Sequence, residues 1–460
     1  MANNLKCFKA YDIRGQIGDD LNESIAWKIG VAYGKYLNPR KIAVGGDIRH
    51  STQSLKAALI DGLISTGVDV LDLGLTGTEE IYYAVISQSL DGGIEVTGSH
   101  NPKTDNGLKL VRAEARPISG DTGLLEIKNI AENLSPSSLQ NVSKGKHINT
   151  SFKEEFVDYL LQFINFKNIR PTSIIANCGH GAAGPILKLI SNRFIDLQIP
   201  IKFEFIGLEP NGDFPLGLPN PLLPENRKAT SKVVIERKAD LGLAWDGDFD
   251  RCFFFDETGE FVESYYLVGL FARHFLAENP GAAIVHDPRL VWNTIDLVNA
   301  AGGRPVVCKT GHAFIKEKMR QEKAIYGGEM SAHHYFSNFS YCDSGMITWL
   351  ILLAILYKSN NNLSSLVSER KAKFPCSSEL NYNVKSTSAV LDSVLNKYEK
   401  YALTKNFTDG LSLEMPNWRF NLRSSNTEQL LRLNLETRCN NIEIKDMIYD
   451  IEKTINLFTI

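Results

Sequence analysis

Residues 41–74 have the sequence KIAVGGDIRHSTQSLKAALIDGLISTGVDVLDLG. KIAVGGD is typical of a strand. A helical pattern comes next, in which Leu55, Leu59 and Leu63 recur at near-helical spacing. Gly67 ends that pattern, and VDVLDLG is again typical of a strand. The stretch therefore predicts a strand–helix–strand unit of an α/β sheet.

The same alternation continues through most of the chain. Asn22 is placed to cap an earlier helix whose apolar face is Ile25, Ile29, Ala32 and Tyr36. The strand-like runs SIIANC and ADLGLAW, and then AAIVHD, PVVCKTG and AIYGGE, are each followed by polar or glycine residues or by a helical pattern. This predicts three related doubly wound α/β domains, alike in pattern rather than in letters.

The pattern changes after Lys371, where the alternation weakens. The segment Trp418 to Glu436 combines a strand-like start with Arg, Ser, Asn and Thr, which is typical of a smaller α+β domain. We therefore predict domains with the bounds 1–150, 151–256, 257–370 and 371–460.

The composition is that of an ordinary globular protein. The 460 residues include 50 Lys and Arg against 53 Asp and Glu, for a net charge of −3, and 43% are hydrophobic. The basic residues are dispersed, which excludes the charge pattern of a protein that binds nucleic acid or a membrane surface and favours a small-molecule partner. The apolar run Ile347 to Tyr357 has about half of the ~20 residues that a membrane-spanning helix needs, so we expect a buried helix.

The cysteines indicate a reducing compartment. There are seven, they lie far apart, and no two have the C-x-x-C spacing of zinc or redox sites. The first residues, MANNLK, lack the apolar stretch of a secretory signal, so we expect a cytoplasmic protein.

An acidic turn lies between the strand-like runs LGLAW and CFFF. Asp246, Asp248 and Asp250 alternate in it, so their carboxylates would project to one side of an extended segment, and Gly247 allows a bend that brings the oxygens together. Three like charges so close would repel one another unless a cation lay between them. A hard divalent ion is expected, and Mg²⁺ if phosphate shares the coordination.

Two other interpretations compete with this metal site. A solvated acidic turn is disfavoured, because such turns seldom lie between two buried strands. A calcium loop of the helix-loop-helix type would place Glu257 at its twelfth position. Its sixth position, however, is Arg251 rather than Gly, and CFFF is typical of a strand, so the calcium loop is rejected.

A second candidate turn, Thr97 to Pro102, follows the strand-like run GGIEV. Ser99 would be exposed to a ligand at a strand end, although a plain polar turn explains the sequence equally well. His100 is not expected to act as its base, because adjacent side chains on an extended segment point to opposite faces, and a Ser-His-Asp hydrolase is therefore disfavoured. A phosphorylated Ser99 would instead complete the shell of a metal held by the three carboxylates.

Two further polar segments offer groups that suit a sugar phosphate. Glu329 and Ser331 are of the kind that binds neighbouring sugar hydroxyls. The adjacent side chains of His333 and His334 diverge, and no third metal ligand is spaced nearby, so a structural or ligand-facing role is favoured for them over metal binding. Arg423 begins the loop RSSNTE, whose guanidinium, hydroxyls and amide suit a phosphate. A polar loop that caps a helix would explain it equally well.

One motif favours a different function. Gly179 to Gly184 matches G-x-G-x-x-G after a strand, and Glu204 lies twenty residues beyond it, as in a dinucleotide-binding site. Pro185 follows at once, however, and Glu204 falls inside the run IKFEFIG rather than at a strand end. A tight structural turn is therefore the preferred interpretation.

Together these motifs resemble the α-D-phosphohexomutase family, and within it the bacterial phosphomannomutases that feed GDP-mannose into surface polysaccharide. The resemblance runs over essentially the whole chain, from FKAYDIRG at residues 8–15 to the Arg423 loop, with four motifs in the family's order. It implies a heart-shaped arrangement of the domains around a central cleft, Mg²⁺, a hexose phosphate substrate and glucose or mannose 1,6-bisphosphate as activator. Monomer and homodimer both remain open.

The resemblance also implies a role for each motif residue. Ser99 would be the phosphoserine and, with the three aspartates, a ligand of Mg²⁺, and Lys109 would be the general acid/base. The other implied residues are Arg14, His100 and Asn101 near this phosphate, Arg251, Lys309 and His312 in support of the site and the sugar pocket, Glu329, Ser331 and His333 at the sugar, and Arg423, Ser425, Asn426 and Thr427 at the non-reacting phosphate.

Several positions depart from the family's usual pattern. Gly98 stands where Ala is common, Gln429 where Pro is frequent and Ala332 where Gly is frequent. None removes a reacting group, so these differences bear on rate and substrate preference. Met330, where glucose-directed relatives carry an acid, favours mannose. A nicotinamide-dependent dehydrogenase and a non-catalytic sugar-phosphate binding protein remain as alternative functions.

Overall fold

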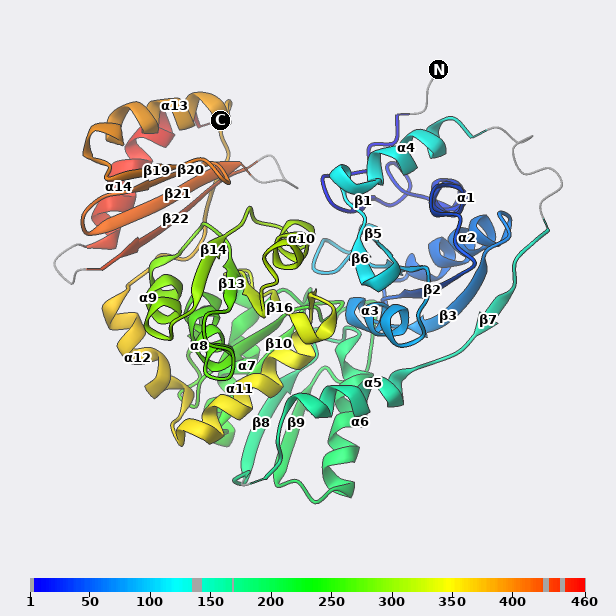
Figure 1. Ribbon diagram of the computed structural model, residues 1–460, viewed down its shortest axis with the longest axis horizontal. Coiled ribbons are helices and arrows are strands. Elements are labelled where there is room, and N and C mark those ends of the chain that lie inside the picture. Colours follow the sequence, from blue (N-terminus) through cyan, green and yellow to red (C-terminus); the bar gives the residue numbers. More distant parts are fainter. Residues whose placement is uncertain (1–3, 135–142, 168, 425–429, 439–442, 460) are drawn as a thin grey trace. The chain divides into compact units, whose positions relative to one another are not determined.

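The computed structural model describes residues 4–134, 143–167, 169–424, 430–438 and 443–459 (Figure 1). The chain divides into two compact units. Unit 1 consists of Met1–Phe261 and Asn338–Asn360, and unit 2 of Val262–Ser337 and Asn361–Ile460. In the described part of the chain, no helix has both the length and the apolar character needed to cross a bilayer.

The first sheet of unit 1 has the strand order β1-β5-β4-β2-β3-β7, with β6 paired to β5. Its strands are β1 Ile13–Gln16, β2 Lys41–Gly46, β3 Asp69–Leu75, β4 Gly92–Val96, β5 Asp105–Arg112, β6 Arg116–Pro117 and β7 His147–Asn149. The helices that accompany it are α1 Glu23–Leu37, α2 Thr52–Ile64, α3 Thr78–Ser87 and α4 Leu124–Glu132, with the short 3-10 turns η1 Ala113–Ala115 and η2 Gly120–Thr122.

The second sheet of unit 1 has the order β12-β11-β10-β8-β9. Its strands are β8 Thr172–Asn177, β9 Ile201–Ile206, β10 Leu241–Trp245, β11 Cys252–Phe255 and β12 Phe261–Val262. The nearby helices are α5 Lys153–Leu160, η4 Leu161–Phe163, α6 Ala183–Asp196 and α7 Pro224–Arg237.

A later segment of the chain, β17 Cys342–Asp343 and α11 Gly345–Ser359, also belongs to unit 1. The side chain of Ser344 caps α11 by accepting from Ile347 N at 2.9 Å. Trp349 is buried in α11, and its ring lies edge-on to Phe203 with 5.8 Å between centroids. The prediction that this apolar run is a buried helix is confirmed.

Unit 2 begins with strands in the order β14-β13-β15-β16. They are β13 Ala283–His286, β14 Arg304–Val307, β15 Tyr326–Gly328 and β16 His334–Phe336, with η5 Ser337–Phe339 after them. The helices are α8 Ser264–Leu276, α9 Trp292–Ala300, α10 His312–Glu322 and α12 Leu363–Lys373.

The C-terminal part of unit 2 has a different architecture, as predicted. Its sheet is antiparallel, in the order β18-β22-β21-β20-β19. The strands are β18 Leu380–Tyr382, β19 Thr404–Asn406, β20 Leu411–Glu414, β21 Trp418–Ser424 and β22 Leu431–Thr437, and the helices are α13 Thr387–Tyr398 and α14 Ile444–Ile455, with η6 Glu399–Tyr401 and η7 Asn456–Phe458. Both helices contribute to one core with the sheet, for example through Val394, Leu433 and Ile451.

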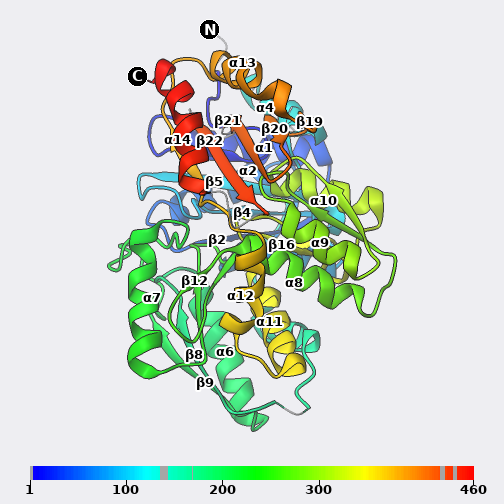
Figure 2. The ribbon, with the colours of Figure 1, turned by 90° about the vertical axis from the view of Figure 1, so that its left-hand side faces the viewer.

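One strand arrangement occurs three times in the chain. In each repeat a central strand pairs in parallel with a strand on either side, giving β4-β2-β3, β10-β8-β9 and β15-β13-β14. The third strand of each repeat then pairs antiparallel with the next strand of the chain. Because such crossovers are right-handed, the two connecting helices lie on opposite faces, as Figure 2 shows for α6 and α7 around β8 and β9. The prediction of three related doubly wound domains is confirmed.

The first predicted helix is capped as the sequence indicates. Asn22 Oδ1 accepts from Ile25 N at 3.1 Å at the start of α1. Ile29 and Ala32 of its apolar face are fully buried.

Replacing this cap tests how much it contributes. Asn22→Ala should lower the free energy of unfolding by about 1 kcal/mol, because Ile25 N would lose its acceptor. Asn22→Ser retains an acceptor and is the matched control. The measurement is the shift in the urea midpoint of unfolding, and equal losses in the two variants would contradict a capping role.

Candidate active site

The three turns singled out in the sequence occupy the same place in the repeat. Ser99 lies between β4 and β5, Asp246 between β10 and β11, and Glu329 between β15 and β16. Each turn thus follows the carboxyl end of the third strand of its repeat, the edge at which ligands bind in open α/β sheets. The first two turns belong to unit 1 and the third to unit 2.

Ser99 is buried, and its hydroxyl lies beside the acidic turn. Ser99 Oγ lies 3.2 Å from Asp246 Oδ2 and 3.0 Å from His100 Nδ1. The backbone at Ser99 is left-handed, with φ of 48°. The prediction that the side chains of Ser99 and His100 point to opposite faces is therefore wrong, because it assumed an extended backbone.

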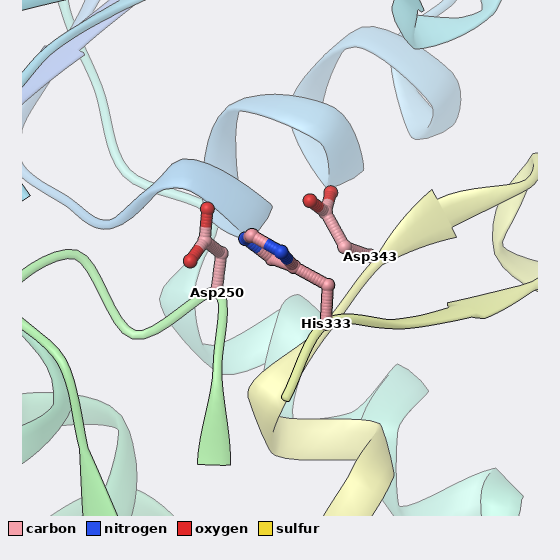
Figure 3. Close-up of side chains that lie close together, drawn as sticks. All are labelled: Asp250, His333 and Asp343. Carbon is pink, nitrogen blue, oxygen red and sulfur yellow. The ribbon is translucent and has the colours of Figure 1, made fainter. Parts of the chain in front are cut away.

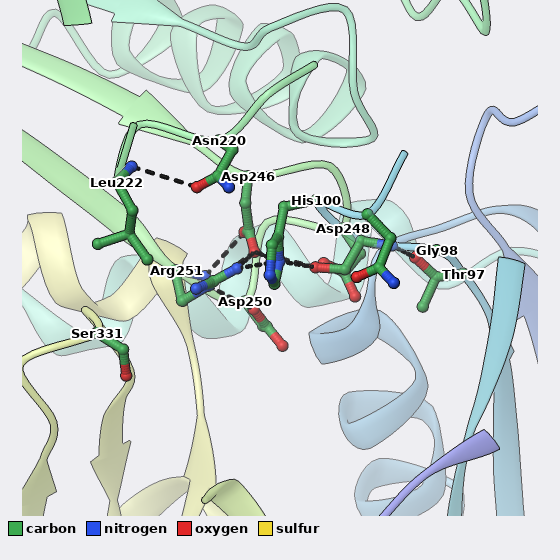
Figure 4. Close-up of polar contacts among 12 residues, drawn as sticks. Thr97, Gly98, His100, Asn220, Leu222, Asp246, Asp248, Asp250, Arg251 and Ser331 are labelled. Atoms are coloured by element: carbon green, nitrogen blue, oxygen red, sulfur yellow. Dashed lines mark hydrogen bonds and ion pairs between the residues drawn. The ribbon is translucent and has the colours of Figure 1, made fainter. Parts of the chain in front are cut away.

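The three carboxylates of the acidic turn converge, as predicted. Asp246, Asp248 and Asp250 are buried, and each offers an oxygen within 4.8 Å of the others (Figure 4). The segment is a turn rather than an extended strand, and Phe249 has φ of 48°. Within the described residues, the buried Asp248 Oδ1 accepts no hydrogen bond. An unpaired carboxylate oxygen beside two further carboxylates fits a hard divalent cation.

Two cationic side chains balance part of this negative charge. Lys109 Nζ donates to Asp248 Oδ2 at 2.7 Å and to Asp250 Oδ2 at 2.5 Å. Burial acts to lower the pKa of Lys109, but the two carboxylates outweigh it and hold the pKa above its usual value. Arg251 Nε donates to Asp246 Oδ2 at 2.8 Å. Burial nevertheless raises the pKa of Asp246 to about 7, against the charge of Arg251.

His100 is neutral in this arrangement. Arg251 Nη2 donates to His100 Nδ1, and since a guanidinium only donates, Nδ1 is the unprotonated ring nitrogen. Burial, together with the charges of Arg251 and Arg14, lowers the pKa of His100 well below its usual value. His100 Nδ1 therefore accepts from Arg251, while the Ser99 hydroxyl donates to Asp246 Oδ2.

Arg14 reaches the serine turn from a neighbouring strand. β1 pairs antiparallel with β5, which places Arg14 opposite Gly107. Arg14 Nη1 donates to Asn101 Oδ1 at 2.8 Å, and Nε donates to Asp12 Oδ2 at 2.6 Å. Unit 1 thus carries, on adjoining segments, the predicted residues Arg14, Ser99, His100, Asn101, Lys109, Asp246, Asp248, Asp250 and Arg251.

Close backbone packing holds the acidic turn against the serine turn. A Cβ on Gly247 would lie 2.4 Å from the carbonyl oxygen of Ser99, and one on Gly181 would lie 2.8 Å from the carbonyl oxygen of Gly247. Ala182 N also donates to Gly247 O at 3.0 Å. The segment Gly179 to Gly184 therefore supports the acidic turn, which favours the structural interpretation of its glycines over a dinucleotide site.

Two residues that lie beside the acidic turn were missed in the sequence. Thr78 donates its hydroxyl to Asp248 Oδ2 at 2.7 Å and its backbone N to Asp248 O at 3.1 Å. It follows β3 at the ligand-binding edge of the sheet, and this position is the signal that could have identified it. Asp343 brings a carboxylate oxygen within 4.8 Å of Asp250 (Figure 3). It comes from a distant segment, so no local pattern marks it.

In unit 2, Glu329 is held by several donors. Its Oε1 accepts from Gly311 N at 3.0 Å, and its Oε2 accepts from Tyr335 OH at 2.5 Å and from His333 Nδ1 at 3.0 Å. Burial opposes ionisation, but the hydrogen bond and charge of His333 and the charge of Arg289 hold the pKa of Glu329 well below its usual value. Glu329 is therefore an ionised, acceptor-only group.

The other predicted residues of unit 2 lie on nearby segments. Ser331 Oγ accepts from Arg289 Nη2 at 3.2 Å. Lys309 precedes α10, whose first residue is His312. Arg423 on β21 donates to Glu379 Oε2 at 3.3 Å. Ser425, Asn426, Thr427 and Gln429 lie outside the described residues.

The resemblance led us to expect glycine at the position of Ala332, and the backbone there fits that expectation. Its φ is 71°, in the left-handed region that glycine adopts at less cost than alanine.

Comparison with known proteins gives a consistent result. Residues 5–137, 154–259 and 263–374 match the phosphoglucomutase/phosphomannomutase α/β/α domains I, II and III, respectively. A protein of Salmonella montevideo named phosphomannomutase is 54% identical over 436 residues, which are 95% of this chain and 96% of that protein. A Xanthomonas campestris protein named phosphohexose mutases is 50% identical over 434 residues, which are 94% of this chain and 95% of that protein.

A solved structure shows the same likeness. A phosphoglucomutase/phosphomannomutase family protein from Burkholderia thailandensis is 30% identical and superposes with a TM-score of 0.86, covering 99% of this chain and 98% of its own. Three matched domains, together with relatives of this identity over nearly the whole chain, establish the family. The chain belongs to the phosphoglucomutase/phosphomannomutase family.

Proposed function

We propose that the protein is a phosphomannomutase, an isomerase that interconverts mannose 6-phosphate and mannose 1-phosphate. In this proposal Ser99 carries the phosphoryl group, and a hexose 1,6-bisphosphate is the intermediate. One observation carries it: the Ser99 hydroxyl lies 3.2 Å from a carboxylate of the buried acidic triplet. The name phosphomannomutase of the Salmonella montevideo relative supports mannose as the sugar. The product would supply GDP-mannose for surface polysaccharide.

The proposed transfer exchanges one phosphorus–oxygen bond for another. The bond from phosphorus to Ser99 Oγ breaks, and a bond from phosphorus to a sugar hydroxyl oxygen forms. The sugar hydroxyl loses its proton, and Ser99 Oγ gains one. Little covalent assistance is needed, so positioning and neutralisation of charge supply most of the rate. Lys109 is the proposed general acid/base for this exchange of protons, and His312 is a proposed aid in moving the sugar's proton.

Asp246, Asp248 and Asp250 would hold Mg²⁺ together with an oxygen of the phosphorylated serine. When bound, the ion would neutralise charge on the phosphoryl group in transfer. Arg14, His100, Asn101 and Arg251 would surround the same phosphate. Their hydrogen bonds to the two turns support this assignment.

The remaining assignments concern the sugar and its second phosphate. Glu329, Ser331, His333 and Lys309 would bind the sugar, and Arg423, Ser425, Asn426 and Thr427 the non-reacting phosphate. Glucose or mannose 1,6-bisphosphate would activate the enzyme by phosphorylating Ser99.

We also propose the domain bounds 1–150, 151–256, 257–370 and 371–460, a cytoplasmic location, and a monomer or homodimer.

Phosphorylation of Ser99 tests the proposed function directly. The peptide that contains Ser99 should carry the added mass of one phosphate, and Ser99→Ala should abolish the interconversion of mannose 6-phosphate and mannose 1-phosphate, measured with Mg²⁺ and bisphosphate. Ser54→Ala, on the exposed surface of α2, is the control and should remain active. A fully active Ser99→Ala enzyme would contradict the proposal. If the wild type binds the sugar phosphate without isomerising it, a non-catalytic binding protein is favoured. If the wild type binds NADH tightly, a dehydrogenase is favoured.

Thermal unfolding tests the metal site without an activity assay. Mg²⁺ should raise the Tm of the wild-type protein, because the ion binds the folded acidic turn and not the unfolded chain. Asp248→Asn removes one charged ligand and should abolish most of this increase. Glu257→Gln, which would remove the last ligand of a calcium loop, should leave it unchanged. A Mg²⁺ response that depends on Glu257 and not on Asp248 would overturn the assignment.

The sugar preference is measurable as a ratio of specificity constants. We expect kcat/KM to be larger for mannose 1-phosphate than for glucose 1-phosphate, since Met330 replaces the acid that glucose-directed relatives carry. Met330→Glu should shift the ratio toward glucose. A wild-type ratio that favours glucose would show that Met330 does not determine the preference.

A further inference from the structure

Asp47 lies just after β2 and accepts hydrogen bonds from both sides of the serine turn. Its Oδ2 accepts from Thr97 Oγ1 at 2.8 Å and from Gly98 N at 3.0 Å. Its Oδ1 accepts from Arg49 N at 3.0 Å and from Thr52 Oγ1 at 2.6 Å. All four partners are donors, so this buried position requires an acceptor-only side chain.

Arg49, two residues later, binds the backbone of the same turn from the other side. Its Nη2 donates to the carbonyl oxygens of Ser99 at 2.9 Å and Asn101 at 2.6 Å. Its Nη1 donates to the carbonyl oxygens of Pro102 at 2.6 Å and Asp105 at 3.0 Å. The guanidinium is buried, and its Nε lies 3.4 Å from Asp47 Oδ2. One side chain thus satisfies four carbonyl groups, three in the turn and one at the first residue of β5.

These contacts explain how Ser99 is kept in an unfavourable backbone conformation. The left-handed conformation is unfavourable for any residue other than glycine, so surrounding contacts have to impose it. Ser99 N donates to Thr97 Oγ1 at 2.8 Å, while Thr97 Oγ1 donates to Asp47. The Ser99 carbonyl is held by Arg49. Both peptide groups of Ser99 are therefore fixed, directly or through Thr97, by Asp47 and Arg49.

Gly98 leaves the space that this arrangement occupies. A Cβ at residue 98 would lie 2.4 Å from Arg49 Nε and 2.5 Å from its Cζ. A side chain at residue 98 would therefore displace the guanidinium from its observed position.

The third repeat of the fold contains an equivalent pair of aspartate and arginine. Asp287 and Arg289 follow its central strand, β13, as Asp47 and Arg49 follow β2. Asp287 Oδ1 accepts from Arg289 N at 2.9 Å, and Oδ2 accepts from Met330 N at 2.8 Å, in the turn after the third strand. In the second repeat Asn177 Oδ1 accepts from Gly179 N at 3.0 Å, and this glycine stands at the position of the arginine. The Asp-x-Arg sequence therefore recurs as a support for a turn.

We propose that Asp47 and Arg49 position Ser99 for phosphoryl transfer, by clamping the backbone of its turn so that Oγ faces the acidic triplet. They are positioning residues, because their hydrogen bonds reach Ser99 through its peptide groups and through Thr97. The inference rests on the proposed function, in which Ser99 carries the phosphoryl group. It adds two residues that the sequence motifs did not include.

Arg49→Lys is the first test. A single ammonium group cannot reach the four carbonyls, so Ser99 should lose its alignment and kcat should fall by about 100-fold, the effect expected for a displacement of about 1 Å. KM for mannose 1-phosphate should stay within about twofold, because the clamp does not bind the sugar. Lys56→Met is the matched control: it breaks another buried ion pair of this domain, to Asp72 at 2.6 Å, and should leave kcat within about twofold.

Thr97→Val is the second test and decides the question if Arg49→Lys does not fold. The change keeps the shape of the side chain but removes the hydroxyl that connects Asp47 to Ser99 N. It should lower kcat at least tenfold with KM unchanged, and Thr97→Ser, which restores the hydroxyl, should recover most of the rate. If Thr97→Val keeps kcat within about twofold, or if Arg49→Lys lowers it no more than Lys56→Met does, the inference is wrong.

These outcomes separate the clamp from the proposed function itself. If Ser99→Ala is inactive while the Arg49 and Thr97 variants behave like the wild type, only the clamp fails. If Ser99→Ala is active, the phosphoserine assignment fails first. Transfer of phosphate from phosphorylated Ser99 to mannose 1-phosphate in a single turnover should show the same loss of rate as kcat, since the clamp acts on this step.

Discussion

The repulsion among three buried carboxylates is the constraint on which the site depends. Two unit charges 4 Å apart repel by about 4 kcal/mol at an effective dielectric constant of 20, which is a large share of a domain's stability. Asp246, Asp248 and Asp250 nevertheless lie within 4.8 Å of one another. Lys109 and Arg251 offset part of this cost, and the packing of Gly247 against Ser99 holds the turn where those cations reach it. A bound divalent ion would offset the remainder.

The repeated topology supplies one such turn in each repeat. Every repeat ends its third strand in a turn at the same edge of the sheet, so one fold provides a serine turn, an acidic turn and a turn that carries Glu329. Rigid strands place the ends of the turns, and buried polar contacts then fix the backbone between them. In the proposed phosphoryl transfer, the sheets would supply the rigidity and the few residues that connect their strands would supply the chemistry.

The sequence predicted the sheets better than the local geometry of the candidate site. The strands are identifiable because burial on both faces leaves a nearly continuous apolar run in each segment. The convergence of the aspartates was also predictable, because three neighbouring carboxylates indicate a shared cation. The extended backbone that was assumed for them is not observed. The contact between Ser99 and His100 was not, because a left-handed residue other than glycine leaves no compositional mark. Arg49 was missed because its partners are carbonyl groups some fifty residues away.

The two copies of the Asp-x-Arg sequence show how one motif serves different turns. The turn at 97–104 is long and directs several carbonyls inward, so the guanidinium of Arg49 is taken up by backbone acceptors. The turn at 329–333 is shorter, and Arg289 instead donates to the side chains of Ser331 and Glu379. The aspartate has the same backbone role in both, accepting from the arginine's own N–H and from the opposite turn. The same motif therefore supports the backbone of one turn through both of its side chains, and that of the other through the aspartate while its arginine contacts side chains.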